Sequence, residues 1–74
     1  MWLRDGFDNL IECSGTMFWC EFYKSEGNDM GKIVMQRGGD RETVFRGTQK
    51  ATKEAYARII GAIQMQLPYV ELPQ

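Results

Sequence analysis

An aromatic-rich run from Thr16 to Lys24 decides which folds are open to this chain. Aromatic residues favour strands over helices, and the run alternates as strands do. Residues 7–13 also have the composition of a strand, and Ser14-Gly15 between the two segments is typical of a two-residue turn. The sequence therefore predicts a β-hairpin and, with it, an antiparallel sheet.

The turn at Ser14-Gly15 would fix which side chains share a face. Neighbouring side chains on a strand point to opposite faces. One face would then be apolar throughout and form the core, with Phe7, Ile11, Cys13, Phe18, Cys20 and Phe22. The other face would carry Leu10, Met17, Trp19 and Tyr23 among the acidic residues Asp8, Glu12 and Glu21. The continuous apolar face supports this register.

Two more strands are expected, from Gly31 to Arg37 and from about Glu42 to Arg46, after turns at 25–29 and 38–40. Periodicity leaves open which face of these strands is core. Ile33, Met35 and Val44 share one face, and Val34 and Phe45 share the other.

One helix is expected after the strands, from about Gln49 to Gln66, with Thr48 as its N-cap. Its apolar stripe would consist of Ala55, Tyr56, Ile59, Ile60, Ile63 and Leu67, spaced by three and four residues. Gly61 lowers the helix propensity and would allow a close approach to the sheet. Pro68 ends the helix, and residues 68–74 form an extended tail that either docks as an edge strand or stays loose.

These elements predict the α+β class: an antiparallel β-meander of three to four strands with one C-terminal amphipathic helix packed on one face. With 74 residues, the chain is expected to form a single domain spanning residues 1–74.

The chain lacks the residues on which several classes of functional site depend. The chain contains no histidine, no Cys-x-x-Cys and no P-loop, so we expect no enzymatic activity, no metal and no cofactor.

Cys13 and Cys20 are expected to be buried free thiols, as in a reducing compartment. No apolar run is long enough for a membrane span, and the N-terminus is too acidic and broken for a signal peptide. The expected location is the cytoplasm.

The second hairpin face is the first candidate for a functional surface. One helix can cover only one face of the sheet, so Leu10, Met17, Trp19 and Tyr23 would stay exposed beside acidic residues. Trp and Tyr are frequent at binding hot spots. We therefore expect a protein-binding site formed by Leu10, Glu12, Met17, Trp19, Glu21 and Tyr23. Its acids would suit a partner with a basic surface, and a homodimer through the same face is also possible. The competing interpretation is that Trp2, Leu3 or the C-terminal tail folds over this face.

The charge distribution offers an alternative function. Residues 1–29 carry six acidic and two basic side chains, whereas residues 30–58 carry seven basic and three acidic ones. The basic set Arg37, Arg41, Arg46, Lys50, Lys53 and Arg58 could contact phosphates, and a helix N-terminus also attracts phosphate. The stretch Gly47–Ala55 resembles the start of the last helix in double-stranded RNA-binding domains. That resemblance implies a small nucleic-acid-binding module; the other interpretation is a solvated face.

By its size, its predicted meander and its helix from Thr48 to Leu67, the chain resembles the small proteins with which phages disable bacterial defences, including the anti-CRISPR proteins. The resemblance implies a non-enzymatic inhibitor or modulator, encoded by a phage or mobile element. Such a protein would act in the host-cell cytoplasm and block a larger host machine such as a CRISPR effector.

Overall fold

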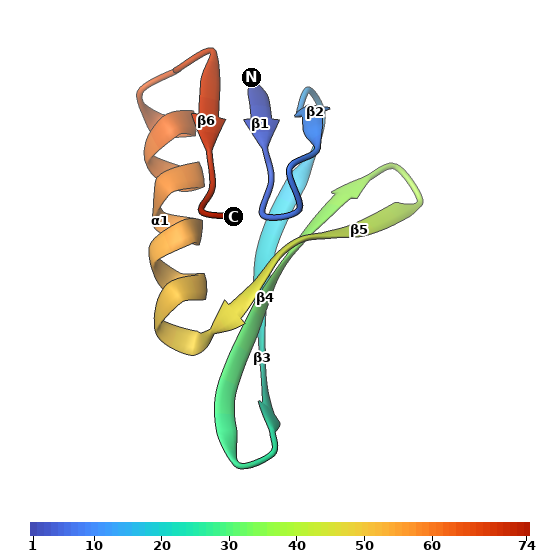
Figure 1. Ribbon diagram of the computed structural model, residues 1–74. Helices are drawn as coiled ribbons and strands as arrows, with labels where there is room; N and C mark the ends of the chain where they lie inside the picture. The colour runs from blue at the N-terminus through green and yellow to red at the C-terminus, as the bar shows by residue number, and fades with distance from the viewer.

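The computed structural model describes all 74 residues. It contains six strands and one helix (Figure 1), and in chain order these are β1 (Trp2–Arg4), β2 (Leu10–Glu12), β3 (Met17–Ser25), β4 (Asn28–Arg37), β5 (Asp40–Thr48), α1 (Gln49–Gln64) and β6 (Tyr69–Glu71).

The strands form two three-stranded sheets. The larger sheet is an antiparallel meander in the order β3-β4-β5. The smaller sheet has the order β2-β1-β6, in which β1 is antiparallel to β2 and parallel to β6. Helix α1 packs on one face of the larger sheet. The predicted α+β class, with its meander and C-terminal helix, is confirmed.

The turn between β3 and β4 follows ordinary turn chemistry. Ser25 pairs with Asn28, so Glu26 and Gly27 form a two-residue turn, and both have positive φ, 51° and 80°. Turns of this kind match the twist of the strands that they join. The strands therefore extend further than the sequence predicted, since β4 begins at Asn28 rather than at Gly31.

The predicted hairpin about Ser14-Gly15 is wrong. β3 pairs with β4 along its whole length, and β2 pairs with β1 instead of β3. The chain reverses earlier, where Asp5 Oδ1 accepts the backbone N–H groups of Phe7 (2.9 Å) and Asn9 (2.8 Å). A carboxylate that binds two amides can define a turn without an Asn-Gly or Asp-Gly pair. The predicted pairing of residues 7–13 with 16–24 consequently does not form.

The predicted core face is only partly correct. Cys13 belongs to the core, and Ile11, Phe18 and Cys20 pack against it. Phe7 and Phe22, however, are 51% and 47% exposed. Phe7 lies in the loop after β1, and Phe22 lies opposite Gly31, which offers it no side chain to pack on.

A bulge in β5 explains which residues of β4 and β5 face the core, which periodicity had left open. The β4–β5 register shifts between Ile33 and Val34, and both Val44 and Phe45 join the core cluster with Ile33 and Met35. A bulge places two successive residues against one residue of the partner strand, which breaks strict alternation. The core of the larger sheet therefore takes residues from both predicted sets.

The same core is shared by the smaller sheet and the helix. Leu3 of β1, Ile59 of α1 and Leu72 after β6 are all fully or almost fully buried in it. Gly6 N donates to Val44 O at 2.8 Å, which links the β1–β2 loop to β5. Each sheet thus turns one face inward and the other face away from a common core.

Helix α1 begins as predicted and ends two residues earlier. The side chain of Thr48 accepts a hydrogen bond from Ala51 N at 3.1 Å, which confirms it as the N-cap. The buried residues of the helix are Thr52, Ala55, Ile59 and Ala62. Ile63 and Leu67 are 48% and 41% exposed, so the predicted stripe is wrong at its C-terminal end.

Gly61 does not serve a close approach to the sheet, as the sequence suggested. A Cβ atom at this position would have no neighbour within 4 Å. We therefore expect Gly61→Ala to raise the free energy of unfolding by about 1 kcal/mol, because alanine has the higher helix propensity. Urea unfolding followed by circular dichroism measures this change, and an unchanged or lower stability would contradict the open environment of Gly61.

The C-terminal segment is an ordered part of the fold. β6 pairs with β1 from Tyr69 to Glu71, and Leu72 is 1% exposed. Gln74 Nε2 donates to Asp5 O at 2.7 Å. Of the two outcomes predicted for residues 68–74, docking as an edge strand is the one observed.

Cys13 and Cys20 are both free, as predicted. Cys13 is buried, whereas Cys20 is only half-buried. Burial raises the pKa of both thiols, which disfavours the reactive thiolate.

Candidate protein-binding face

The outer face of the larger sheet, on the side away from α1, is covered by no other element of the chain. Its strand register brings together Met17, Trp19, Glu21 and Tyr23 from β3, Lys32, Val34 and Gln36 from β4, and Arg41, Thr43 and Arg46 from β5. We call this surface the cationic face.

Trp19 lies on the edge strand β3 of the cationic face and is half-buried. It is paired with Val34 on β4, a residue that is only 6% exposed although it points away from the core. The Arg41 guanidinium lies over the indole, 5.3 Å from the ring centroid. Trp19 and Arg41 therefore form a cation–π pair that shields an apolar residue from water.

Glu21 joins the aromatic and cationic parts of the face. Its carboxylate accepts a hydrogen bond from Trp19 Nε1 at 2.9 Å and lies 3.6 Å from Lys32 Nζ. The bond from Trp19 contributes most to lowering the pKa of Glu21, and the nearby Lys32 and Arg41 add to it. Glu21 is thus ionised at neutral pH and holds the indole in place.

Positive charge exceeds negative charge on this face. Lys32, Arg41 and Arg46 are its cations, whereas Glu21 lies on the face and Glu42 lies at its border. A shallow hollow next to Trp19 is lined by Glu21, Lys32, Val34, Arg41, Glu42 and Thr43. Exposed Met17 (64%) and Tyr23 (37%) add apolar surface on either side of Trp19 along β3.

The sequence placed Leu10 and Glu12 on the same surface as Trp19, and the structure does not. Both residues belong to β2 in the smaller sheet. Glu12 Oε1 accepts the Ser14 N–H at 2.6 Å, and its other oxygen lies 3.6 Å from the N-terminal amino group. Asp8 is paired with Arg4 at 2.8 Å. Of the acids predicted around Trp19, only Glu21 adjoins it; Asp8 and Glu12 do not, because their placement depended on the hairpin that does not form.

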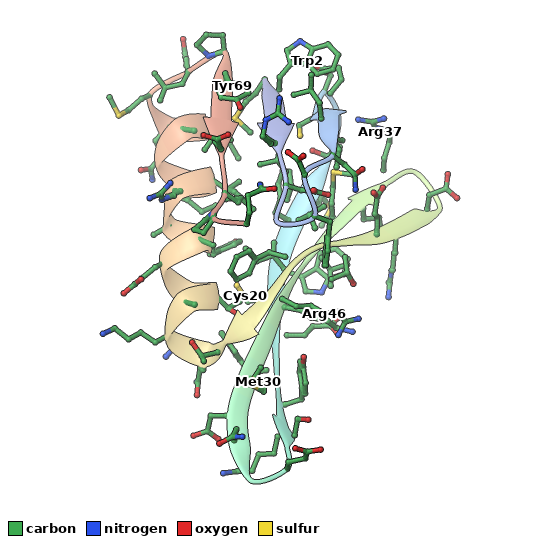
Figure 2. All side chains as sticks on the ribbon, in the orientation of Figure 1. Trp2, Cys20, Met30, Arg37, Arg46 and Tyr69 are labelled. Carbon is green, nitrogen blue, oxygen red and sulfur yellow. The ribbon has the colours of Figure 1, made fainter.

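The predicted basic set does not form one face either. Arg41 and Arg46 lie on the cationic face, whereas Arg37 lies at the end of β4 near the β4–β5 turn (Figure 2). Lys50 and Lys53 line a hollow at the start of α1, and Lys53 Nζ lies 5.7 Å from the Phe22 ring centroid. Arg58 Nη1 donates to Glu71 O at 3.1 Å. The six cations are distributed over separate parts of the molecule.

Sequence reasoning missed Lys32, Val34 and Thr43 as members of this face. Alternation within residues 31–37 places Lys32 and Val34 on one side of their strand, but it does not say which side faces the helix. The bulge beside Val44 also disturbs alternation in β5. Only the pairing of β3 with β4 shows that these residues adjoin Trp19.

Comparisons with protein-family models, with curated protein sequences and with solved structures gave no significant match to this chain. The single helix lacks the length and hydrophobicity that crossing a membrane would require.

Proposed function

We propose that the protein is a non-enzymatic binding domain that uses the cationic face to hold another protein. The observation that carries the proposal is the Trp19–Arg41 pair, which joins the two edge strands across an uncovered sheet face, with Met17 and Tyr23 nearby. Trp, Tyr, Met and Arg are the residue types enriched in protein interfaces. An apolar centre with charged neighbours is the usual organisation of such an interface.

The partner is expected to present acidic and apolar side chains. The cationic face has three cations against two carboxylates, Glu21 and Glu42, so complementary charge on the partner is negative. The basic partner surface expected from the sequence relied on Asp8 and Glu12, which lie elsewhere. The proposed partner surface at Trp19 is therefore acidic, whereas the sequence led us to expect a basic one.

The inhibitory role that the resemblance to phage anti-defence proteins implies stays a prediction. An uncovered sheet face that presents a tryptophan would support it, because such a face can occupy the working surface of a larger protein. The phage origin, the host-cell cytoplasm and a CRISPR effector as the target stay predictions as well.

An affinity experiment tests the proposed function. The immobilised protein is incubated with a bacterial lysate, and the proteins that it retains over an empty support are identified and purified. The binding affinity is then measured by calorimetry. Arg41→Glu is expected to weaken binding at least about tenfold, because it removes the cation–π contact and reverses the charge.

Met65→Ala is the matched control, since Met65 is 72% exposed at the end of α1 and does not belong to the cationic face. Equal affinities for all three proteins would contradict the proposed function.

Nucleic-acid binding stays the alternative prediction, and one observation favours it: Trp19 and Tyr23 share a face with Lys32, Arg41 and Arg46. Exposed aromatic rings beside cations can bind single strands by stacking. The Arg41 guanidinium, however, lies over the Trp19 ring that a base would need to contact. A gel shift with labelled single-stranded and double-stranded oligonucleotides at low salt should show no retarded species, and a salt-sensitive shift would favour the alternative.

A further inference from the structure

The smaller sheet has an uncovered outer face of its own. Leu3, Ile11 and Val70 point to the core from its three strands. Their neighbours point outward, and we call the surface that they form the acidic face: Trp2, Arg4, Leu10, Glu12, Tyr69 and Glu71.

The acidic face carries exposed apolar side chains on all three of its strands. Trp2 is 47% exposed, Leu10 53% and Tyr69 43%. Trp2 and Tyr69 are register partners on β1 and β6, and their side chains lie at the same end of the molecule (Figure 2). Two exposed aromatic side chains that adjoin on an open sheet form an apolar patch of the kind found at interaction sites.

Negative charge exceeds positive charge on this face and at its border, where three carboxylates stand against two cations, the Arg4 guanidinium and the N-terminal amino group. The Arg4 guanidinium lies between Asp8 (2.8 Å) and Glu71 (3.5 Å), and its Nε donates to the Tyr69 hydroxyl at 3.2 Å. Glu12 is a third carboxylate, beside the N-terminal amino group. The hydrogen bond from Ser14 chiefly lowers the pKa of Glu12, so this carboxylate is ionised at neutral pH.

The cationic face and the acidic face are therefore complementary in charge. Each presents a tryptophan and a tyrosine, one with an excess of cations and the other with an excess of carboxylates. Both sheets turn their inner faces to one shared core, so the outer faces point away from it and cannot meet within one molecule. They can meet only between two copies of the chain.

We propose that the acidic face of one copy binds the cationic face of a second copy. This inference rests on the proposed function, because it names a partner for the same cationic face. Two cationic faces repel one another, as do two acidic faces, so contact between like faces is disfavoured. A contact between unlike faces leaves one face of each kind free, and the assembly extends into a ring or a filament instead of stopping at a dimer.

Light scattering on the purified protein, from micromolar to millimolar concentration, tests the proposal. The average mass of the unmodified protein should rise beyond that of a dimer, and high salt should reverse the rise. The Arg41→Glu variant loses the cationic face and the Glu71→Lys variant loses the acidic face. Each variant alone should remain monomeric, and an equimolar mixture should form a one-to-one complex that grows no further.

The exposed helix residue Glu54 gives the charge-matched control, and the Glu54→Lys variant should assemble like the unmodified protein. Circular dichroism on all variants confirms that each is folded. A monomer at every concentration would overturn the proposal, and so would a Glu71→Lys variant that dimerises alone, since that result indicates contact between like faces. A monomeric protein whose partner binding is still weakened by Arg41→Glu would reject self-assembly alone and leave the proposed function standing.

Discussion

Trp19→Ala is expected to weaken binding to the protein partner about thirtyfold, a loss of about 2 kcal/mol, while the domain stays folded. The indole is the largest side chain of the cationic face, and it contacts the Arg41 guanidinium and the Glu21 carboxylate. Alanine removes all three contributions at once. Calorimetric titration of the purified partner measures the loss.

The fold should tolerate this change because Trp19 lies outside the core cluster. Removing it exposes Val34 and ends the cation–π contact, which costs about 1 to 2 kcal/mol of stability. Trp19→Phe serves as the comparison, since it keeps an aromatic ring under Arg41 but not the hydrogen bond to Glu21. An intermediate affinity is expected for Trp19→Phe. An unfolded Trp19→Ala protein would show that Trp19 is structural, and an unchanged affinity would remove it from the binding site.

Asp5→Ala is expected to lower the free energy of unfolding by about 3 kcal/mol. Asp5 is fully buried, and its Oδ1 atom accepts the backbone N–H groups of Phe7 and Asn9. Alanine leaves these two donors without an acceptor in the turn that positions β2 beside β1. Urea unfolding followed by circular dichroism measures the change.

The Asp5→Asn variant tests whether the hydrogen-bond acceptor or the negative charge of the Asp5 side chain defines the turn. The asparagine Oδ1 atom can still accept both N–H groups, and the substitution removes a buried charge whose Oδ2 atom has no hydrogen-bond partner. We expect a loss of less than about 1 kcal/mol for this variant. If Asn were as damaging as Ala, the negative charge and not the acceptor geometry would define the turn.

The parts of the fold that the sequence predicted correctly depend on local patterns. The aromatic run identified β3, and the N-cap oxygen of Thr48 together with the apolar spacing identified α1. Alternation along β3 also placed Met17, Trp19, Glu21 and Tyr23 on one face, because the direction of a side chain follows from its own strand. These features need no knowledge of distant residues.

The parts of the fold that the sequence predicted incorrectly depend on which strands pair with one another. Ser14-Gly15 has turn composition, but the carboxylate of Asp5 and the turn at Glu26-Gly27 decide the pairing. β1 contains only three residues, too few for periodicity to detect. The neighbours of Trp19 were consequently assigned from the wrong strand, and acids were expected where the structure has Lys32 and Arg41.

A titration of the isotopically labelled protein with its purified partner, followed by nuclear magnetic resonance, tests directly whether the cationic face is the binding site. The indole N–H of Trp19 and the amides of Met17, Tyr23 and Arg41 should show the largest shift changes, with little change along the exposed side of α1. Changes concentrated on α1 and β6, with the Trp19 indole signal unmoved, would contradict the assignment of this face.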